Sequence, residues 1–425
     1  MDTLSSRANS FLSSNPNSYG SIHVSMLGDV YDQDSNPNGA ILMSIAENKL
    51  CNELFVNKMQ QHAPITLSAM NYTNPTGAAS LKAAMAQCLN SHVFGLEKDC
   101  TRQVKEEELI ISTGCTGLLY QLSVLMFEQG DSILIPAPYY PAFDQDFGSL
   151  GGVHRIPVVP SDLDSYELTE ESLTSAYNTG LSAGQPPKAL LLTNPHNPVG
   201  KVYSASELRL AVDWCRQRRV HLICDEIYAL SVFDPSVEGP FQSITSVLNN
   251  QLGDFVHVLW GVSKDLGGSG LRVGVLYSQN QTLLAAVNGI SPAFQVSNVI
   301  QEILAGVLVD ASFMTTLQKE SNTKVLHSYQ LLTSGLDRLQ IPYRPVGAGI
   351  FVFIDLRGLL RQDSFEGERE LHQALAREIK WSLTPGEACH HPVPGFFRAC
   401  YCWVSTAAIE ECLRRLERFI ATWRA

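Results

Sequence analysis

The sequence contains no CxxC pair, no hydrophobic run long enough to cross a bilayer and no internal repeat. Its 10 cysteines are scattered without the regular spacing of a disulfide framework, which is typical of buried or free thiols in a reducing compartment. Cys389, His390 and His391 are adjacent, but neighbouring side chains cannot easily converge on one ion without distant ligands. We therefore expect core or surface roles for these residues and no metal site.

Positive charge is also in short supply. The chain has 30 Lys and Arg residues against 42 Asp and Glu residues, a formal net charge of −12, which argues against a general nucleic-acid or anionic-membrane surface. The first residues, MDTLSSRANSFLSS, lack the apolar core of a secretory signal peptide. The expectation is a soluble, cytoplasmic protein with neither a nucleic acid nor a membrane as partner.

Short apolar runs alternate with amphipathic segments between about residues 105 and 280. The runs are ELIIST, SILIP, KALLLT, VHLICD, FVHVLW and LRVGVLYS. Such an alternation predicts a mostly parallel sheet with helical crossovers. Ser204 and Glu207 have the spacing of a capping box before LRLAVDWCRQRR, so one crossover helix is expected to begin there.

The pattern changes after about residue 295. Longer helical segments are followed by GIFVFIDL, a predicted strand, and by AAIEECLRRLERFIATW, a predicted amphipathic helix. This part of the chain indicates a second, smaller α+β domain. We expect an α/β fold with a large domain of residues 51–294 and a small domain built from residues 1–50 and 295–425.

One lysine stands out in the stretch GVSKDLGGSGLRVG. Lys264 follows the predicted strand FVHVLW, and ligands of open α/β folds bind beside the carboxyl ends of the strands. A P-loop is excluded because its lysine follows the glycines and precedes Ser or Thr, whereas Asp265 comes next here. A dinucleotide-binding fingerprint fails because its third glycine would stand at Val273. A solvated surface lysine remains the alternative.

Other polar residues also follow predicted strands. Asp225 and Tyr228 lie in CDEIY, Asn197 in NPHNPVG and Tyr140 in PAPYYPAF. A pyridoxal-phosphate site needs this inventory: an amine for the Schiff base, a carboxylate for the ring nitrogen, donors to the phenolic oxygen and an aromatic ring for stacking. Asn197 has an alternative role, because asparagine before proline is ordinary turn chemistry.

Together SKDLGGSGLRVG, DEIY, TNPHNPVG and PYYPAFDQDF resemble the fold-type I pyridoxal-phosphate enzymes of the class I and II aminotransferase branch, from about residue 30 to the end of the chain. Within that branch NPNGAILMSIAENKL, PAPYYPAFDQD and PGFFRACY resemble segments of 1-aminocyclopropane-1-carboxylate synthases. The resemblance implies pyridoxal 5'-phosphate as cofactor and seven strands in the mostly parallel sheet of the large domain.

The resemblance also implies roles for single residues. Lys264 would carry the cofactor and then act as the base at the substrate's Cα, and Asp225 would bind the ring nitrogen. Tyr228 and Asn197 would bond the phenolic oxygen. Tyr140, rather than the tyrosine before it, would stack on the ring.

Phosphate binding is implied for the backbone amides of Cys115 and Thr116 and for the side chain of Arg272. Tyr72, in MNYTNPTG, matches the tyrosine that reaches the phosphate of the partner subunit's cofactor, which implies a homodimer with a shared active site. Gly261 departs from the family, because relatives usually have a phosphate-binding serine three residues before the lysine.

The substrate is implied to be an amino acid whose α-carboxylate pairs with Arg398 of PGFFRACY. Glu47, in the AEN segment, matches a glutamate near the substrate's amine and sulfonium, which favours S-adenosylmethionine; otherwise it is a solvated acid at a helix start. On this reading methylthioadenosine leaves and a cyclopropane amino acid remains.

Three alternatives stay open, because Gln145 stands where synthases commonly have arginine. The first is an aminotransferase for an aromatic or other bulky amino acid. The second is an enzyme that uses S-adenosylmethionine for γ-replacement by an external nucleophile. The third is a catalytically silent binding protein of the same fold.

Overall fold

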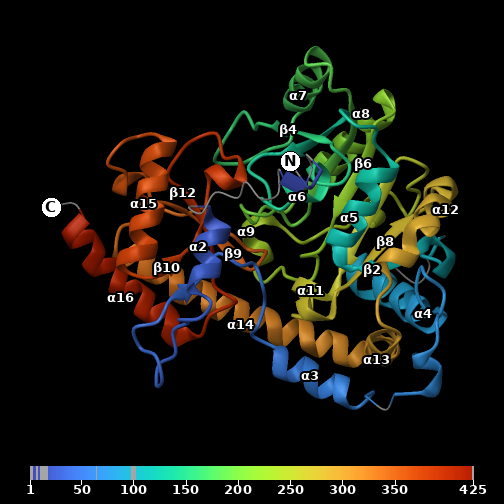
Figure 1. The fold of residues 1–425 in the computed structure, drawn as a ribbon, viewed down its shortest axis with the longest axis horizontal. Helices are drawn as coiled ribbons and strands as arrows, with labels where there is room; N and C mark the ends of the chain where they lie inside the picture. Colours follow the sequence, from blue (N-terminus) through green and yellow to red (C-terminus); the bar gives the residue numbers. More distant parts are fainter. Residues whose placement is uncertain (1–2, 6–7, 10–17, 64, 97–101, 424–425) are drawn as a thin grey trace. The chain divides into compact units, whose positions relative to one another are not determined.

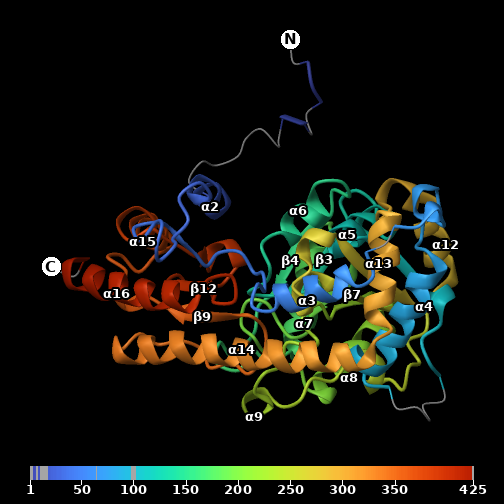
Figure 2. The ribbon, with the colours of Figure 1, turned by 90° about the horizontal axis from the view of Figure 1, so that it is seen from below.

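The computed structural model describes residues 3–5, 8–9, 18–63, 65–96 and 102–423 of the 425-residue chain. By its internal contacts the chain forms two compact units. The small unit comprises Met1–Ala46, His327–Pro345 and Phe351–Ala425, and the large unit comprises Glu47–Leu326 and Val346–Ile350. Figures 1 and 2 follow the chain through both units in two views.

A seven-stranded sheet lies at the centre of the large unit, with strand order β2-β8-β7-β6-β5-β3-β4. The strand β8 runs antiparallel to both its neighbours, and the other neighbouring pairs are parallel. The predicted mostly parallel sheet is confirmed. The strands are β2 (Leu109–Thr113), β3 (Ser132–Pro136), β4 (His154–Val158), β5 (Pro187–Thr193), β6 (His221–Asp225), β7 (Val256–Gly261) and β8 (Val273–Ser278).

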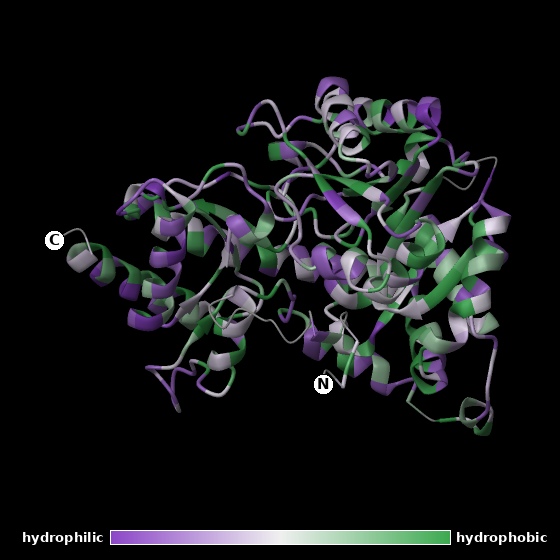
Figure 3. Cartoon of the chain, turned by 45° about the horizontal axis from the view of Figure 1, so that its top comes forward, coloured by the Kyte–Doolittle hydropathy of each residue, from purple (hydrophilic) through white to green (hydrophobic). Residues whose placement is uncertain are grey.

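Both faces of this sheet are buried, because alternate residues of a strand enter two different core clusters. Leu190 and Leu192 of β5 belong to one cluster, whereas Ala189 and Leu191 belong to the other. In Figure 3 the strands of this sheet are largely green, the colour of hydrophobic residues. Continuous apolar runs of this kind are expected in a parallel sheet that is covered on both faces.

Helices supply that cover. The crossover helix predicted from the capping box is α8 (Ala205–Arg218), and Ser204 and Glu207 form the box as expected. The other longer helices of the large unit are α3 (Asn52–Gln60), α4 (Ala79–Cys88), α5 (Gly114–Leu125), α6 (Phe143–Gly148), α7 (Glu170–Ser182), α12 (Gln281–Ile290) and α13 (Asn298–Leu308). Short helical turns are η1 (Leu67–Met70), η2 (Leu89–Val93), η3 (Glu106–Glu108), α9 (Pro235–Glu238), α10 (Ile244–Val247), α11 (Val262–Asp265), η4 (Ser269–Leu271) and η5 (Ser291–Phe294).

The predicted domain boundary at residue 294 is wrong. Helix α13 lies beyond that boundary, yet its residues Leu304, Val307 and Leu308 are buried in the core of the large unit, and the helix packs on α4. Gln301 of α13 also accepts a hydrogen bond from the backbone N–H of Ala78. The large unit therefore extends to residue 326, where the long helix α14 (Ala311–Arg338) passes from one unit into the other.

Among the residues that the structure describes, no single helix is both long enough and apolar enough to cross a membrane. Two segments, Gln281–Phe294 and Asn298–Leu308, pass that test only as a pair, with a bend of 119° between them.

The small unit contains two small sheets. In one, β1 (Ile41–Leu42) pairs in parallel with β10 (Trp381–Ser382), and the other has the antiparallel order β11-β12-β9. The strand predicted from GIFVFIDL and the predicted C-terminal helix are both present. The remaining elements are α2 (Tyr19–Met26), β9 (Phe351–Asp355), η6 (Arg357–Leu359), α15 (Phe365–Glu378), β11 (Thr384–Pro385), η7 (Glu387–Cys389), β12 (Phe396–Cys400) and α16 (Thr406–Trp423).

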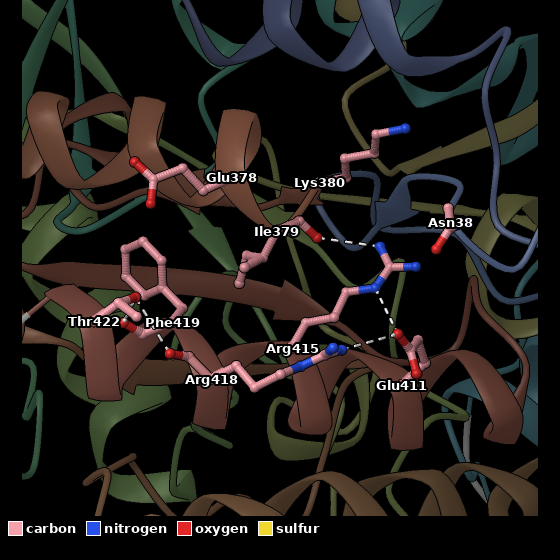
Figure 4. Close-up of a pocket in the computed structure, with 9 residues that line it drawn as sticks. All are labelled: Asn38, Glu378, Ile379, Lys380, Glu411, Arg415, Arg418, Phe419 and Thr422. Carbon is pink, nitrogen blue, oxygen red and sulfur yellow. Dashed lines mark hydrogen bonds and ion pairs between the residues drawn. The ribbon is translucent and has the colours of Figure 1, made fainter.

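A cavity of about 470 Å³ in the small unit is organised by Arg415 of α16 (Figure 4). The Arg415 guanidinium donates to the backbone oxygens of Pro37, Gly39 and Ile379, and its Nε lies 2.8 Å from a carboxylate oxygen of Glu411. This buried arginine therefore ties the C-terminal helix to the N-terminal segment and to the end of α15. Its donors are engaged by the protein itself, which assigns it a structural role.

Candidate active site

Eight predicted cofactor residues line one cavity of about 230 Å³ in the large unit. They come together because the carboxyl ends of parallel strands meet at one edge of a sheet. The antiparallel strand β8 begins at that same edge, which brings in the residue before it. The eight residues are Cys115, Thr116, Tyr140, Asn197, Asp225, Tyr228, Lys264 and Arg272.

The start of α5 and Arg272 form one side of this cavity. A Cβ atom at Gly114 would lie 2.9 Å from Nη2 of Arg272, and one at Gly274 would lie 2.6 Å from the backbone nitrogen of Cys115. Glycine at both positions lets the guanidinium and the helix start approach closely. The first N–H groups of a helix lack intrahelical partners, so N–H donors and a cation meet here, as a phosphate group requires.

Asp225 ends β6 and lies almost completely buried in the cavity wall. Burial raises the pKa of its carboxyl to about 7, against the smaller opposing effects of the Ile227 backbone N–H and the Lys264 charge. Among the described residues, none makes a hydrogen bond with its Oδ1 atom. A buried acid with an oxygen left for a partner fits the protonated ring nitrogen of pyridoxal phosphate.

The structure shows which of two nearby tyrosines and which of two nearby asparagines lines the cavity. Tyr140 lines the cavity, with its ring edge-on to Phe143 at 5.4 Å, whereas Tyr139 is buried and donates its hydroxyl to Asp144. Asn197 lines the cavity. Asn194 instead accepts from the backbone N–H of Tyr203 and donates to a backbone oxygen, so it stabilises the turn.

Lys264 lies on the short helix α11, which a buried neighbour holds in place. Asp265 accepts hydrogen bonds from the indole N–H of Trp260, the backbone N–H of Leu230 and the hydroxyl of Ser231. Those bonds join the end of β7 to the loop after β6, and Lys264 lines the cavity beside them. The position is not that of a solvated surface lysine.

The glycines after Lys264 have a packing reason. Gly267 has a φ of +67°, and a Cβ atom there would lie 2.6 Å from the backbone oxygen of Asn48. Two distant segments therefore approach each other closely. As a result, Ser269, which lines the cavity, donates its hydroxyl to the carboxylate of Glu47. Glu47 is thus one hydrogen bond away from the cavity wall.

Besides Glu47, two predicted residues are not among those that line this cavity. Tyr72 is 99% exposed in its own chain. Arg398 belongs to the small unit, where it is buried on β12 and donates to the backbone oxygen of Ser44 at 2.7 Å and to the Thr384 hydroxyl at 3.1 Å. Their roles toward cofactor and substrate stay predictions.

Sequence reasoning missed Asp146 and Ser269, which both line the cavity. Asp146 stands six residues after Tyr140 in the same segment, but nothing in its neighbours distinguishes it from Asp144. The residue between them, Gln145, is exposed on α6. Ser269 lies in the glycine-rich stretch after Lys264, where a serine is typical of a loop and does not by itself indicate a functional residue.

The departure at Gly261 is built into the packing of the sheet. A Cβ atom there would lie 2.8 Å from the backbone oxygen of Val273 and 3.2 Å from the Ile227 side chain. The strands β7 and β8 therefore approach each other too closely at this point for a side chain, and a serine donor does not fit.

We expect Gly261→Ser to destabilise the protein by about 1–3 kcal/mol, the usual cost of overpacking, without tightening cofactor binding. Thermal unfolding and a cofactor titration measure the two effects. Gly270→Ser is the matched control, because a Cβ atom at Gly270 meets no atom within 4 Å. Tighter cofactor binding at unchanged stability in Gly261→Ser would contradict this reading.

Known proteins resemble this chain over nearly its whole length. The family model for aminotransferase class I and II matches residues 40–416. The 1-aminocyclopropane-1-carboxylate synthase 2 of Oryza sativa subsp. japonica is 31% identical over 404 residues, covering 92% of this chain and 82% of that protein. The 1-aminocyclopropane-1-carboxylate synthase 8 of Arabidopsis thaliana is 30% identical over 406 residues, covering 92% and 85%.

Solved structures show the same fold at lower identity. The aspartate aminotransferase of Rhizobium meliloti superposes with a TM-score of 0.78 at 20% identity and covers 98% of each chain. The aromatic aminotransferase of Pyrococcus horikoshii OT3 has a TM-score of 0.74 at 19% identity, covering 90% of this chain and 96% of that one. These matches confirm the fold-type I architecture, and the family match confirms the predicted cofactor. The chain belongs to the class I and II aminotransferase family of pyridoxal-phosphate-dependent enzymes.

Proposed function

We propose that this enzyme acts on S-adenosylmethionine, removes the Cα proton and closes the ring by displacing methylthioadenosine, giving 1-aminocyclopropane-1-carboxylate. The observation that carries the proposal is the hydrogen bond from Ser269, in the wall of the Lys264 cavity, to the carboxylate of Glu47. It brings an acid to a cavity that is otherwise built for the cofactor. The synthases that are about 30% identical to this chain support the same reaction.

The residues of the cavity have separate tasks. Bound pyridoxal phosphate withdraws electrons from the substrate's Cα. Asp225 compensates the charge of the ring nitrogen, and Arg272 with the start of α5 holds the phosphate. Lys264 takes the proton from Cα onto Nζ. The electron pair left at Cα forms the bond to Cγ while the Cγ–S bond breaks, and the positive sulfur takes the two electrons of that broken Cγ–S bond and leaves as the neutral thioether.

Glu47 and Arg398 are proposed to choose the substrate. The guanidinium of Arg398 suits the planar α-carboxylate, since two parallel N–H donors match its two oxygens. The Glu47 carboxylate, oriented by Ser269, suits the positive sulfonium, which an aspartate or an aromatic amino acid does not carry. A neutral residue at position 47 would remove this preference for a cation.

Two other reactions share these first steps. Transamination is supported by the aminotransferases among the solved structures of the same fold, and it would use Lys264 to return the proton to the cofactor instead. In γ-replacement, an external nucleophile would attack the carbon from which methylthioadenosine leaves.

The products formed from S-adenosylmethionine alone separate these reactions. We expect methylthioadenosine and 1-aminocyclopropane-1-carboxylate in equal amounts by mass spectrometry. Conversion of the cofactor to its pyridoxamine form by other amino acids, with neither product from S-adenosylmethionine, would establish the aminotransferase. Methylthioadenosine release that needs a second substrate would establish γ-replacement.

We also propose that the enzyme is a homodimer that pairs through the segment around η1. Four large side chains there are exposed: Ile65 by 62%, Leu67 by 90%, Met70 by 75% and Tyr72 by 99%. An exposed apolar cluster of this kind typically marks an interface. A second copy would cover it and would receive Tyr72 at its own cofactor phosphate.

Mixed dimers test the shared site. In a shared site, Lys264 comes from one subunit and Tyr72 from the other. A hybrid dimer of Tyr72→Ala and Lys264→Ala subunits therefore has one site with both residues intact and one site with both residues replaced. We expect two weakly active variants to recover roughly a quarter of the wild-type rate after random subunit exchange, since half of the dimers are then hybrids. Activity that equals the mean of the separate variants would contradict a shared site.

A further inference from the structure

Asp146 is a second buried acid in the cofactor cavity, and the mechanism above does not use it. It lies on α6, is 2% exposed and lines the cavity together with Asp225. Its Oδ2 atom, like Oδ1 of Asp225, makes no hydrogen bond to any of the described residues. Two buried carboxyl groups that line the same cavity therefore each keep one oxygen to which none of the described residues is hydrogen-bonded.

The surroundings of Asp146 offer little that would stabilise a charge. Helix α6 packs on α5 and β4. Two titratable side chains of α5, Tyr120 and Cys115, interact electrostatically with Asp146. Burial raises the pKa of both side chains, and the charge of Asp146 acts in the same direction. Strand β4 contributes the cation Arg155, which forms an ion pair with Asp144 of α6. Burial first, and Asp225 second, raise the pKa of Asp146 to about 7.

Asp225 differs from Asp146 in having groups that favour its ionised form. The backbone N–H of Ile227 donates to it, and the charge of Lys264 acts in the same direction. Two neighbouring buried carboxyls do not both ionise readily, so one proton stays with the pair. The cofactor presents one protonated ring nitrogen, which needs one negative charge. The proton of the pair therefore belongs on Asp146.

We propose that Asp146 is a positioning residue of the cofactor site: it remains an uncharged carboxylic acid and donates its proton toward the Asp225 carboxylate, directly or through a water, so that Asp225 alone faces the ring nitrogen with a charge. The proposal rests on the cofactor site and not on the choice of S-adenosylmethionine as substrate. If the S-adenosylmethionine assay gave neither product, the proposed role of Asp146 would not be affected.

Three variants of the full-length enzyme test this role through cofactor affinity. Each is stripped of cofactor and titrated with pyridoxal phosphate. Asp146→Asn keeps the size, the neutral state and a donor, so we expect a Kd within about twofold of wild type. Asp146→Ala loses the donor and should bind roughly tenfold more weakly, the effect of one lost hydrogen bond. Asp144→Asn is the matched control from the same helix and should leave the Kd unchanged.

The pH dependence of stability supplies a readout that does not involve the cofactor. The pKa of Asp146 in the folded protein, about 7, is above the ordinary value of 3.8. The folded state therefore holds more protons than the unfolded state between these values, and wild-type stability falls as the pH rises through this window. An amide in place of this carboxyl carries no such cost, so the gain in unfolding temperature of Asp146→Asn should grow from pH 5 to pH 8. Asp144→Asn should show no such growth.

Either of two results would overturn the proposal. If Asp146→Asn weakens cofactor binding tenfold or more, the site needs a negative charge at this position. If Asp146→Ala and Asp146→Asn bind the cofactor equally well, no donor is required. Should Asp146→Ala fail to fold, the comparison of Asp146→Asn with Asp144→Asn across the pH range still decides.

Discussion

Replacing Lys264 with alanine is expected to lower turnover by roughly 10³-fold or more while the protein still folds. The amine of Lys264 is the proposed base at Cα, and alanine leaves no group in the cavity wall that can take that proton from the same place. The yellow absorbance of the lysine-bound cofactor should also disappear. Steady-state rates, the absorbance spectrum and thermal unfolding measure the three effects.

The fold should survive this change because the buried Asp265 carboxylate joins α11 to the end of β7 and to the loop after β6. Lys188→Ala serves as the control, since Lys188 lies on β5 of the same unit with its side chain about half exposed; it should leave turnover unchanged. Partial rescue of Lys264→Ala by added methylamine would support the loss of a base. Turnover within tenfold of wild type would remove Lys264 from the chemistry.

Asp225→Asn is expected to lower turnover and cofactor affinity and to stabilise the cofactor-free protein against unfolding. An amide cannot compensate the ring nitrogen's positive charge, so we expect turnover to fall by roughly 10²-fold or more, since charge-assisted bonds in a buried site carry several kcal/mol. Cofactor affinity should fall with it. Rates and a pyridoxal-phosphate titration measure both losses.

The gain in stability depends on pH in a defined direction. The pKa of Asp225 is raised from 3.8 to about 7 in the folded protein. Wild-type stability is therefore lost as the pH rises from the ordinary value toward 7, by up to about 4 kcal/mol. Asparagine avoids that cost, so cofactor-free Asp225→Asn should unfold at a higher temperature than wild type at pH 8. Asp213→Asn on the exposed side of α8 should change neither property. A variant that is less stable than wild type at pH 8 would contradict the destabilising burial of the Asp225 carboxyl described above.

The sheet could be predicted from the sequence wherever a strand is buried on both faces. Continuous apolar runs such as KALLLT then mark the strand, as in β5. The strand β4 was not predicted, because it pairs with β3 alone at the edge of the sheet and alternates exposed and buried residues. The boundary between the units was wrong for a similar reason, since α13 joins the large core through packing on α4, which local periodicity does not reveal.

The cofactor cavity could be predicted because its residues follow strands of one sheet, and parallel strands end at one edge. Asp146 could not, since its burial arises only when α6 packs on α5 and β4. The hydrogen bond between Ser269 and Glu47 joins residues 222 positions apart, and no local pattern encodes that contact. Contacts between segments that are distant in the sequence, such as these two, could not be predicted from local sequence patterns.

We expect the cofactor to be bound covalently to Lys264 in this cavity. Borohydride reduction of the purified enzyme fixes the bond between cofactor and lysine, and proteolysis with mass spectrometry then identifies the modified peptide. We predict that the added mass lies on Lys264 and is absent from the Lys264→Ala variant. The same mass on another lysine, such as the buried Lys201 that pairs with Glu207, would contradict the account.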